Sequence, residues 1–508
     1  MSLKPLIHGL CFLAVTGLLH VPARAEVKPH ALFRDHAVLQ QGKPVPVWGT
    51  ANPGEQVTVS LTGQKIGASA GPDGRWIVRL PAMKAGGPHS MVIAGDNRIQ
   101  LEDVWIGEVW ICSGQSNMER QPGPRSGQQP LENWVQEVAS ADYPQIRHYA
   151  VARLPADAPP DDTDGQWDVC SPQTAANFTA AGYYFARDLH RHLKVPVGLI
   201  HTSWGGSPAE AWTSKEVLAT RFPEILEKHQ ESLEQYPSQL ADYQAQEPTL
   251  LKAWEEAAAK AAAEGKSAPP KPTPPRDPAA GRHNWPSALY QGMLAPLMPC
   301  AMRGVIWYQG ESNASRAAQD RTLFPAMIGD WRWRWDQGEF PFLFVQIAPF
   351  RNMNPEIRDA QLHTWKITPN TAMVVTTAVG DANDIHPTRK EPVGARLALA
   401  ARSLAYGEPI EFSGPVFDRM TVEGPRAVLT FKHLGGGLVA KDGPLRGFEI
   451  SADGKTFVPA AAEITGETLT VSAGAVDRAG AVRYAWSNTP DGNFFNRAGL
   501  PATPFRTE

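Results

Sequence analysis

Two side chains far apart in the sequence, Ser116 and His386, have the types needed for nucleophilic catalysis. Ser116 lies in CSGQSNM, residues 112–118, directly after the apolar run VWIGEVWI. His386 lies in GDANDIHP, residues 380–387. A serine hydroxyl attacks well only when a base takes its proton, and histidine is the side chain whose unperturbed pKa is nearest neutrality. The pair predicts chemistry through an acyl-serine, provided that the fold brings both together.

Acyl transfer also needs donors aimed at the carbonyl oxygen, which becomes an anion in the tetrahedral intermediate. The candidates are the backbone N–H of Ser116, an N–H of Gly205 or Gly206 in HTSWGGS, and the side-chain amide of Asn313 in QGESN. Glycine allows the backbone to approach a substrate closely. Losing one such donor costs about 100- to 1,000-fold in turnover in enzymes of this kind.

The predicted elements place these clusters at one edge of a sheet. Five short apolar runs bounded by loops, most with helical patterns between them, predict an open and mostly parallel α/β sheet. Because ligands bind at the carboxyl ends of such strands, the clusters after the first, second, third and fifth runs are expected to face one crevice. The runs are Val104–Ile111, Val197–Ile200, Gly304–Tyr308, Phe342–Ile347 and Ala372–Thr377.

Each cluster also has a structural interpretation. Ser116 and the glycine pair are compatible with ordinary turns, and Glu311 and Asn313 are compatible with helix caps. His201 is a rival base because it too follows a strand, although no acid stands beside it in the sequence. Only the joint occurrence of the clusters makes the catalytic interpretation the better one.

The rest of the chain predicts two β units around the α/β unit. Alternating apolar residues and turn signals indicate a small β unit over residues 26–100 and a second one over 406–508, with the α/β unit at 101–405. An insertion at about 214–282 contains a run of helix formers, residues 251–264, and the proline-rich APPKPTPPRDP, residues 268–278. The proline-rich run is expected to be an extended, exposed spacer.

The first 25 residues predict a cleavable signal peptide. Lys4 precedes the apolar stretch Leu10 to Leu19, and Ala23-Arg24-Ala25 offers small residues at the two positions that a signal peptidase reads. The stretch is too short for a membrane span. We therefore expect cleavage after Ala25 and a secreted or periplasmic protein.

Composition excludes several classes of partner and cofactor. The formal net charge is −4 over 508 residues and basic residues are scattered, so nucleic acid is not expected as a partner. Beyond the signal peptide an odd number of cysteines (Cys112, Cys170 and Cys300) leaves at least one thiol free unless chains pair. No zinc-ligand spacing or HExxH occurs, and the chemistry requires no metal or organic cofactor. The oligomeric state is left open.

The motifs resemble a known family. GQSNM, SWGGSPAEAW, WYQGESNA and NDIHP together resemble the sialate O-acetylesterase group of the SGNH (GDSL-like) hydrolases. The segments AVLQQGKPVPVWG, ALYQGMLAPL and RAGLPATPFRTE also resemble it, so the likeness runs nearly end to end apart from the insertion.

The resemblance implies a flavodoxin-like three-layer α/β/α core, flanked by N- and C-terminal β-sandwich-like domains. It implies a serine esterase that removes acetyl groups from an acetylated sugar or polysaccharide through an acetyl-serine. Carried over to this sequence, Ser116 is the nucleophile and His386 the general base and acid. Ser116, Gly205 and Asn313 take the oxyanion-hole roles.

The acid that orients His386 is the point at which the sequence departs from the pattern. Many SGNH hydrolases place it three residues before the histidine, where this chain has Asn383. In related carbohydrate acetylesterases the glutamate of a QGE motif takes that role, which favours Glu311 here. Asp384 is the second choice, and a dyad held by a backbone carbonyl is a third.

The substrate and a different protein class stay open. Sialic acid would favour a cation at the site, with Arg120, Arg316 and Arg389 near the motifs, but xylan or xyloglucan are alternative substrates. Three tryptophans, Trp204, Trp212 and Trp307, are expected either to stack on sugars or to belong to the core. A catalytically idle carbohydrate-binding protein is the alternative of another class, and a peptidase or lipase is a third.

Overall fold

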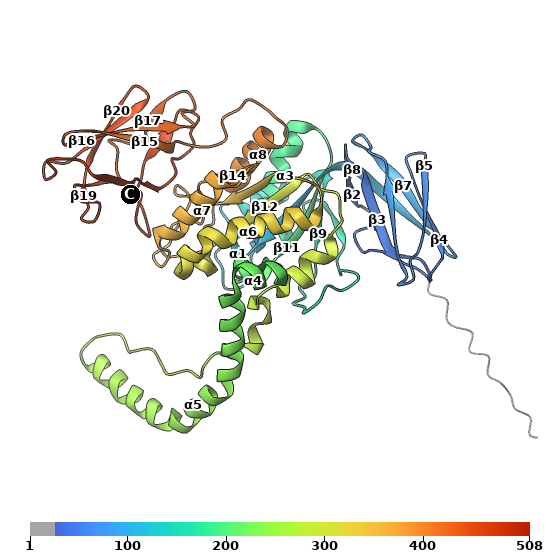
Figure 1. Ribbon diagram of the computed structural model, residues 1–508, viewed down its shortest axis with the longest axis horizontal. Helices are drawn as coiled ribbons and strands as arrows, with labels where there is room; N and C mark the ends of the chain where they lie inside the picture. Colours follow the sequence, from blue (N-terminus) through green and yellow to red (C-terminus); the bar gives the residue numbers. More distant parts are fainter. Residues whose placement is uncertain (1–25) are drawn as a thin grey trace, which may run out of the picture.

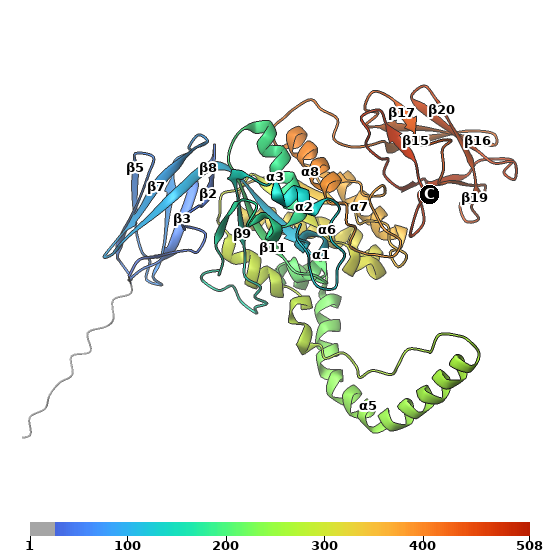
Figure 2. The ribbon, with the colours of Figure 1, turned by 180° about the vertical axis from the view of Figure 1, so that it is seen from behind.

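The computed structural model describes residues 26–508 and shows an α/β unit between two β units (Figures 1 and 2). A long helical arm projects from the α/β unit (Figure 1). The expected signal peptide, residues 1–25, lies outside the described residues. None of the helices in residues 26–508 combines the length and apolar character of a membrane span.

The central sheet confirms the five predicted strands. They are β8 (Arg98–Gly114), β11 (Val197–Ser203), β12 (Gly304–Tyr308), β13 (Phe342–Val345) and β14 (Thr371–Val374). All are parallel, and they lie in the order β11-β8-β12-β13-β14. Numbered along the chain this is the 2-1-3-4-5 order of flavodoxin-like sheets.

Two strands that the sequence analysis missed extend the sheet beyond β11. β9 (Tyr143–Ala150) pairs in parallel with β11, and β10 (Trp167–Cys170) pairs antiparallel with β9 at the edge. β10 has only four residues, and β9 carries the polar residues Gln145, Arg147 and His148. They therefore lack the continuous apolar runs that mark the central strands.

Helices cover both faces of the sheet. The helices α3 (Ala180–Leu193) and α8 (Glu391–Leu404) pack together on one face, and α6 (Ala317–Trp335) and α7 (Pro355–Ile367) lie on the other. Successive side chains of β12 point to opposite faces of the sheet. Trp307 packs with Trp331 of α6, whereas Tyr308 belongs to the core that includes α3 and α8. This is the alternation expected of a strand buried on both sides.

The N-terminal β unit shares a strand with the central sheet. The first part of β8 pairs antiparallel with β7 and in parallel with β2, and its last part lies between β11 and β12. The expected boundary after residue 100 therefore falls inside a continuous strand. The strands of the unit before β8 are β1 (Lys28–Pro29), β2 (Val38–Gln40), β3 (Val45–Thr50), β4 (Gln56–Leu61), β5 (Gln64–Ser69), β6 (Arg75–Leu80) and β7 (Gly86–Ala94).

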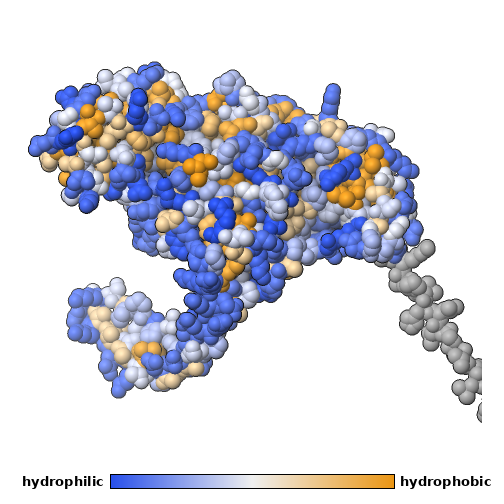
Figure 3. Space-filling model, viewed as in Figure 1, coloured by the Kyte–Doolittle hydropathy of each residue, from blue (hydrophilic) through white to orange (hydrophobic). Residues whose placement is uncertain are grey.

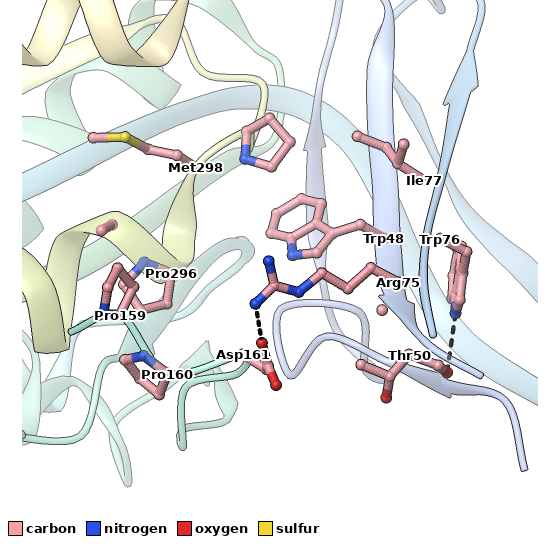
Figure 4. Close-up of a pocket in the computed structure, with 13 residues that line it drawn as sticks. Trp48, Thr50, Arg75, Trp76, Ile77, Pro159, Pro160, Asp161, Pro296 and Met298 are labelled. Carbon is pink, nitrogen blue, oxygen red and sulfur yellow. Dashed lines mark hydrogen bonds and ion pairs between the residues drawn. The ribbon is translucent and has the colours of Figure 1, made fainter. Parts of the chain in front are cut away.

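A cavity of about 480 Å³ lies where this β unit meets the α/β unit (Figure 4). Trp48 and Arg75 reach into it from the β unit, and Pro159 and Pro296 line the opposite wall. An ion pair between Arg75 and Asp161 crosses the junction. Because neither Ser116 nor His386 lines this cavity, it is separate from the predicted site.

The insertion forms the arm. The predicted helix at 251–264 is the end of a longer helix, α5 (Pro223–Ala263), in which Ile225 is the only buried residue. The proline-rich segment runs back along α5. Trp254 Nε1 donates to the Pro269 carbonyl at 2.8 Å, and the Tyr243 hydroxyl donates to the Pro272 carbonyl at 3.4 Å. The arm projects away from the rest of the molecule (Figures 1 and 2), as expected for an exposed insertion.

The C-terminal residues form the second predicted β unit, with its own core around Leu429, Ile450 and Phe494. Its sheets have the strand orders β15-β16-β21-β20, β17-β23 and β19-β18-β22-β24. The strands are β15 (Val416–Glu423), β16 (Arg426–Lys432), β17 (Leu438–Ala440), β18 (Phe448–Ser451), β19 (Val458–Pro459), β20 (Ala461–Thr465), β21 (Thr468–Ser472), β22 (Ala481–Tyr484), β23 (Phe494–Asn496) and β24 (Phe505–Arg506).

The arm is expected to contribute little to the stability of the rest of the chain. Replacing residues 232–274 by a short Gly-Ser linker should change the thermal unfolding midpoint by less than about 2 to 4 °C, because these residues bury almost no apolar surface. As the matched control, Ile225→Ala should lower the midpoint further, since a buried Ile→Ala change costs about 2 to 5 kcal/mol. Differential scanning calorimetry measures both. A larger loss from the deletion than from Ile225→Ala would contradict the expectation.

Candidate active site

Ser116 follows a sharp turn at the carboxyl end of β8. Gly114 has φ +136°, and a Cβ there would lie 2.2 Å from the Tyr308 carbonyl oxygen, so glycine alone fits. The Gln115 N–H donates to the same carbonyl at 3.0 Å. The short helix α1 (Ser116–Glu119) then begins, with Ser116 as its first residue. The turn therefore presents Ser116 at the edge where substrates of parallel sheets bind.

The clusters after four strands line one open cavity of about 430 Å³. The convergence predicted from the sequence is therefore observed. In residues 26–508 no hydrogen bond joins the Ser116 hydroxyl to His386, although both line this cavity; catalytic hydrogen bonds in unliganded enzymes are often long and shorten when substrate binds. The lining residues are Gln115, Ser116, Glu119, Arg125, Gln128, Gly205, Gly206, Glu311, Ser312, Ile385 and His386.

The carboxylate beside His386 belongs to Asp384. His386 Nδ1 lies 3.6 Å from Asp384 Oδ1, and the His386 backbone N–H donates to the same oxygen at 2.8 Å. Burial, with the nearby charge of Lys390, lowers the pKa of His386 below 6.5, while Asp384 opposes the shift. The imidazole is therefore neutral at neutral pH, the form that accepts a proton.

Glu311, the favoured partner of His386 in the sequence analysis, faces elsewhere. Its Oε1 accepts a hydrogen bond from Asn117 Nδ2 at 2.6 Å, and its Oε2 is buried without a hydrogen-bond partner in the described residues. Burial raises the pKa of Glu311. Glu311 lines the cavity without contacting the imidazole, so the structure brings Asp384 rather than Glu311 to His386.

The predicted oxyanion donors differ in their surroundings. The Ser116 N–H, in the first turn of α1, has no hydrogen-bond partner within residues 26–508. A Cβ on Gly205 would lie 3.2 Å from Ser116 Cβ, but the Gly205 N–H donates to the Glu119 carboxylate. Asn313 does not line the cavity: its Nδ2 donates to Glu210 Oε2 at 3.1 Å.

Several other candidates lie outside the cavity. The rival base His201 is buried, which lowers its pKa to about 4, and its Nε2 is 2.6 Å from Ser203 Oγ. Trp212 and Trp307 are fully buried core residues, and only Trp204 is partly exposed. The three free cysteines, Cys112, Cys170 and Cys300, form no disulfide, which agrees with the expectation that at least one thiol stays free.

Known proteins match nearly the whole chain. A family model described as "Carbohydrate esterase, sialic acid-specific acetylesterase" matches residues 106–250 and 281–403. The chain belongs to this family. It is 30% identical to sialate O-acetylesterase of Rattus norvegicus, over 94% of this chain and 93% of that protein. The corresponding Homo sapiens protein is 29% identical over 90% of this chain and 88% of its own length.

A crystal structure titled as a novel carbohydrate acetylesterase from Xanthomonas citri is also similar. Its TM-score is 0.80 at 34% sequence identity, and the match covers 95% of this chain and 99% of that one. Family and relatives together identify the chain as a carboxylic ester hydrolase of the carbohydrate acetylesterase kind.

The esterase carries arginines at the cavity that sequence analysis missed. Arg125 lines the cavity, and it and Arg153 both contact the buried Glu119 carboxylate. The arginines named from the sequence are placed differently: Arg316 pairs with Glu210 at 2.6 Å, and Arg389 lies 3.3 Å from Glu132. Arg125 follows no strand and belongs to no motif, so only the fold around α1 reveals it.

The two carboxylates at the site should have different effects on the pH dependence of the esterase. We expect kcat/KM for p-nitrophenyl acetate to fall with an apparent pKa below 6.5 as His386 is protonated, because burial lowers the pKa of His386. Asp384→Asn should move this acid limb to still lower pH, since it removes the negative charge that raises the pKa of His386. Glu311→Gln is the matched control. Profiles over about pH 4 to 8 that shift only in the Glu311 variant would reverse the assignment.

Proposed function

We propose that the esterase removes O-acetyl groups from sialic acid-type sugars through an acetyl-serine intermediate. The observation that carries the proposal is that Ser116 and His386 line one open cavity at the carboxyl edge of the sheet. The relatives named sialate O-acetylesterase, which match along almost their whole length, support the substrate class.

In the proposed reaction the Ser116 hydroxyl attacks the acetyl carbonyl while neutral His386 takes its proton. The tetrahedral intermediate collapses, the C–O bond to the sugar breaks, and His386 returns the proton to the leaving hydroxyl. Water then attacks the acetyl-serine with His386 again as the base, which releases acetate. Asp384 orients the imidazole and stabilises the imidazolium that forms during attack.

The oxyanion is proposed to lie against the Ser116 N–H and an N–H of the glycine pair. Gly206 lines the cavity, and no bond occupies its N–H within residues 26–508, whereas that of Gly205 is engaged by Glu119. Asn313 is left out of these donors because it does not line the cavity and its amide donates to Glu210. Preset donors of this kind act strongly because they need no reorganisation during reaction.

Membership of the SGNH class and export from the cytoplasm are further parts of the proposal. The 2-1-3-4-5 strand order supports SGNH membership, as do the serine, glycine and histidine segments after the first, second and fifth strands. Export is supported by the signal-peptide pattern of the first 25 residues.

The nucleophile is tested by Ser116→Ala. This variant should lose release of acetate from p-nitrophenyl acetate by at least about 1,000-fold while it keeps its unfolding midpoint, because it removes the attacking hydroxyl. When the wild-type protein is mixed with substrate and the reaction is stopped after a short time, mass spectrometry should reveal an acetyl group on the peptide containing Ser116. Full activity in the variant would overturn the mechanism. Glycan binding without turnover in the wild type would favour the idle carbohydrate-binding alternative.

The choice between sialic acid and plant hemicellulose is tested at Arg125. A guanidinium binds a carboxylate well, and O-acetylated sialic acid carries one whereas acetylated xylan does not. Arg125→Gln should therefore lower kcat/KM for O-acetylated sialic acid about tenfold relative to acetylated xylan oligomers, a difference of about 1.4 kcal/mol. Acetate release from both substrates measures the ratio. A wild type that prefers xylan would replace the proposed substrate with the alternative.

A further inference from the structure

A buried lysine lies beneath the catalytic cavity. Lys390 is 1% exposed, its Nζ donates to Asn117 Oδ1 at 2.5 Å, and it lies 4.9 Å from the centroid of the Tyr308 ring. Lys390 forms no ion pair within residues 26–508, although the charges of Glu311 and Asp384 partly offset the effect of burial on its pKa. Lysine is almost never fully buried without a charged partner, because removing the ammonium from water is costly. The proposed reaction steps do not use this group.

The order of donors and acceptors fixes the orientation of Asn117. A lysine ammonium only donates hydrogen bonds, and a carboxylate only accepts them. Asn117 stands between the two: Oδ1 accepts from Lys390, and Nδ2 donates to Glu311 Oε1 at 2.6 Å. If the amide were turned over, donor would face donor and acceptor would face acceptor. The charges on either side therefore allow Asn117 one orientation.

In that orientation Asn117 joins the two catalytic segments. It directly follows Ser116 in α1, and its Nδ2 also donates at 3.1 Å to the carbonyl of Ile385, the residue before His386. This amide is therefore a direct tie between the segment of the nucleophile and the segment of the base. Its direction depends on Lys390.

Lys390 is itself held by rigid structure. It is the residue that precedes α8, and its carbonyl accepts the N–H groups of Val393 and Gly394 at 3.1 Å. A Cβ on Gly394 would lie 2.4 Å from Tyr184 Cβ, so α8 approaches α3 too closely to shift freely. The ammonium is thus presented to Asn117 from a fixed point of the helical layer.

We propose that Lys390 is a positioning residue of the esterase, whose ammonium orients the Asn117 amide and thereby holds Ser116 and His386 in reactive register. The inference rests on the proposed roles of Ser116 and His386. A misplacement of about 1 Å at a reacting group can cost about 100-fold in rate, so a device that holds the two segments together affects turnover more than substrate binding.

The test compares Lys390→Met with Lys43→Met. Lys43 is a suitable control because it is a partly buried lysine whose Nζ donates to the Met302 carbonyl, outside the cavity. Lys390→Met should lower kcat for p-nitrophenyl acetate about 10- to 100-fold with KM changed less than about threefold. The rate at which a fluorophosphonate labels Ser116, followed by mass spectrometry, should fall in parallel. Lys43→Met should change neither.

The pH profile gives a signature that loss of packing alone would not produce. The charged groups that influence His386 are Lys390, Asp384, Arg120 and Arg125, and Lys390 lowers the pKa of the imidazole. Burial lowers the pKa of Lys390 to about 7, so it is protonated in the acidic range where His386 titrates. Removing it in Lys390→Met should move the acid limb of kcat/KM to higher pH.

A conservative replacement of Lys390 provides a second test that leaves Asn117 intact. Lys390→Gln removes the charge but keeps N–H donors that can face Asn117 Oδ1. It should therefore keep a kcat at least about tenfold higher than that of Lys390→Met.

The outcomes separate this inference from the proposed function. If Lys390→Met keeps wild-type kcat, labelling rate and pH profile, or if Lys390→Gln loses as much kcat as Lys390→Met, Lys390 is not a positioning residue. If wild-type Ser116 is neither labelled nor acetylated, the proposed function fails instead. If Lys390→Met does not fold, as judged by its unfolding midpoint, Lys390→Gln is compared with Asn117→Leu, which removes the amide: an equal loss of kcat in both overturns the inference.

Discussion

The close contact between Gly114 and the Tyr308 carbonyl is the constraint on which the site depends. β8 is paired on both sides, with β11 and β12, so its end cannot move independently of the sheet. At that end the chain turns immediately beside β12, where a side chain at residue 114 would collide with backbone. Ser116 is thereby placed at the start of α1, where its N–H has no hydrogen-bond partner in the described part of the chain, and it lines the cavity together with His386.

Buried charged groups surround this turn, and their pairing explains why the site tolerates them. Glu119 is contacted by Arg125, Arg153 and the Gly205 N–H, while Glu210 binds Arg316 and Asn313. Each carboxylate links chain segments that follow different strands. Removing one partner of such a pair leaves an uncompensated buried charge, which is far more costly than the net gain of the intact pair. The groups behind the cavity thus hold loops together rather than react.

The units around the core are attached in two physically different ways. The N-terminal β unit is continuous with the central sheet through β8, so its orientation is coupled to the strand that carries the nucleophile. The C-terminal unit has separate sheets and its own core, and the α5 arm buries only Ile225 (Figure 3 shows the largely hydrophilic surface of the arm). Strain at the junction of the N-terminal unit can therefore reach the site directly, whereas the arm is the part most tolerant of change.

The five central strands and the segments that meet at the cavity follow from the amino-acid pattern alone. Parallel strands buried on both faces appear as continuous apolar runs, and their carboxyl ends share an edge, so the pattern predicts that Ser116 and His386 lie at the same edge of the sheet. β9, with polar residues along its length, and the short edge strand β10 lack that pattern and were missed. The folded structure was needed to show that Asp384 rather than Glu311 lies beside His386, that Asn313 turns toward Glu210, and that Arg125 lines the cavity. These outcomes depend on the direction of individual side chains and on partners distant in the chain. Residue spacing along the sequence carries no information about either.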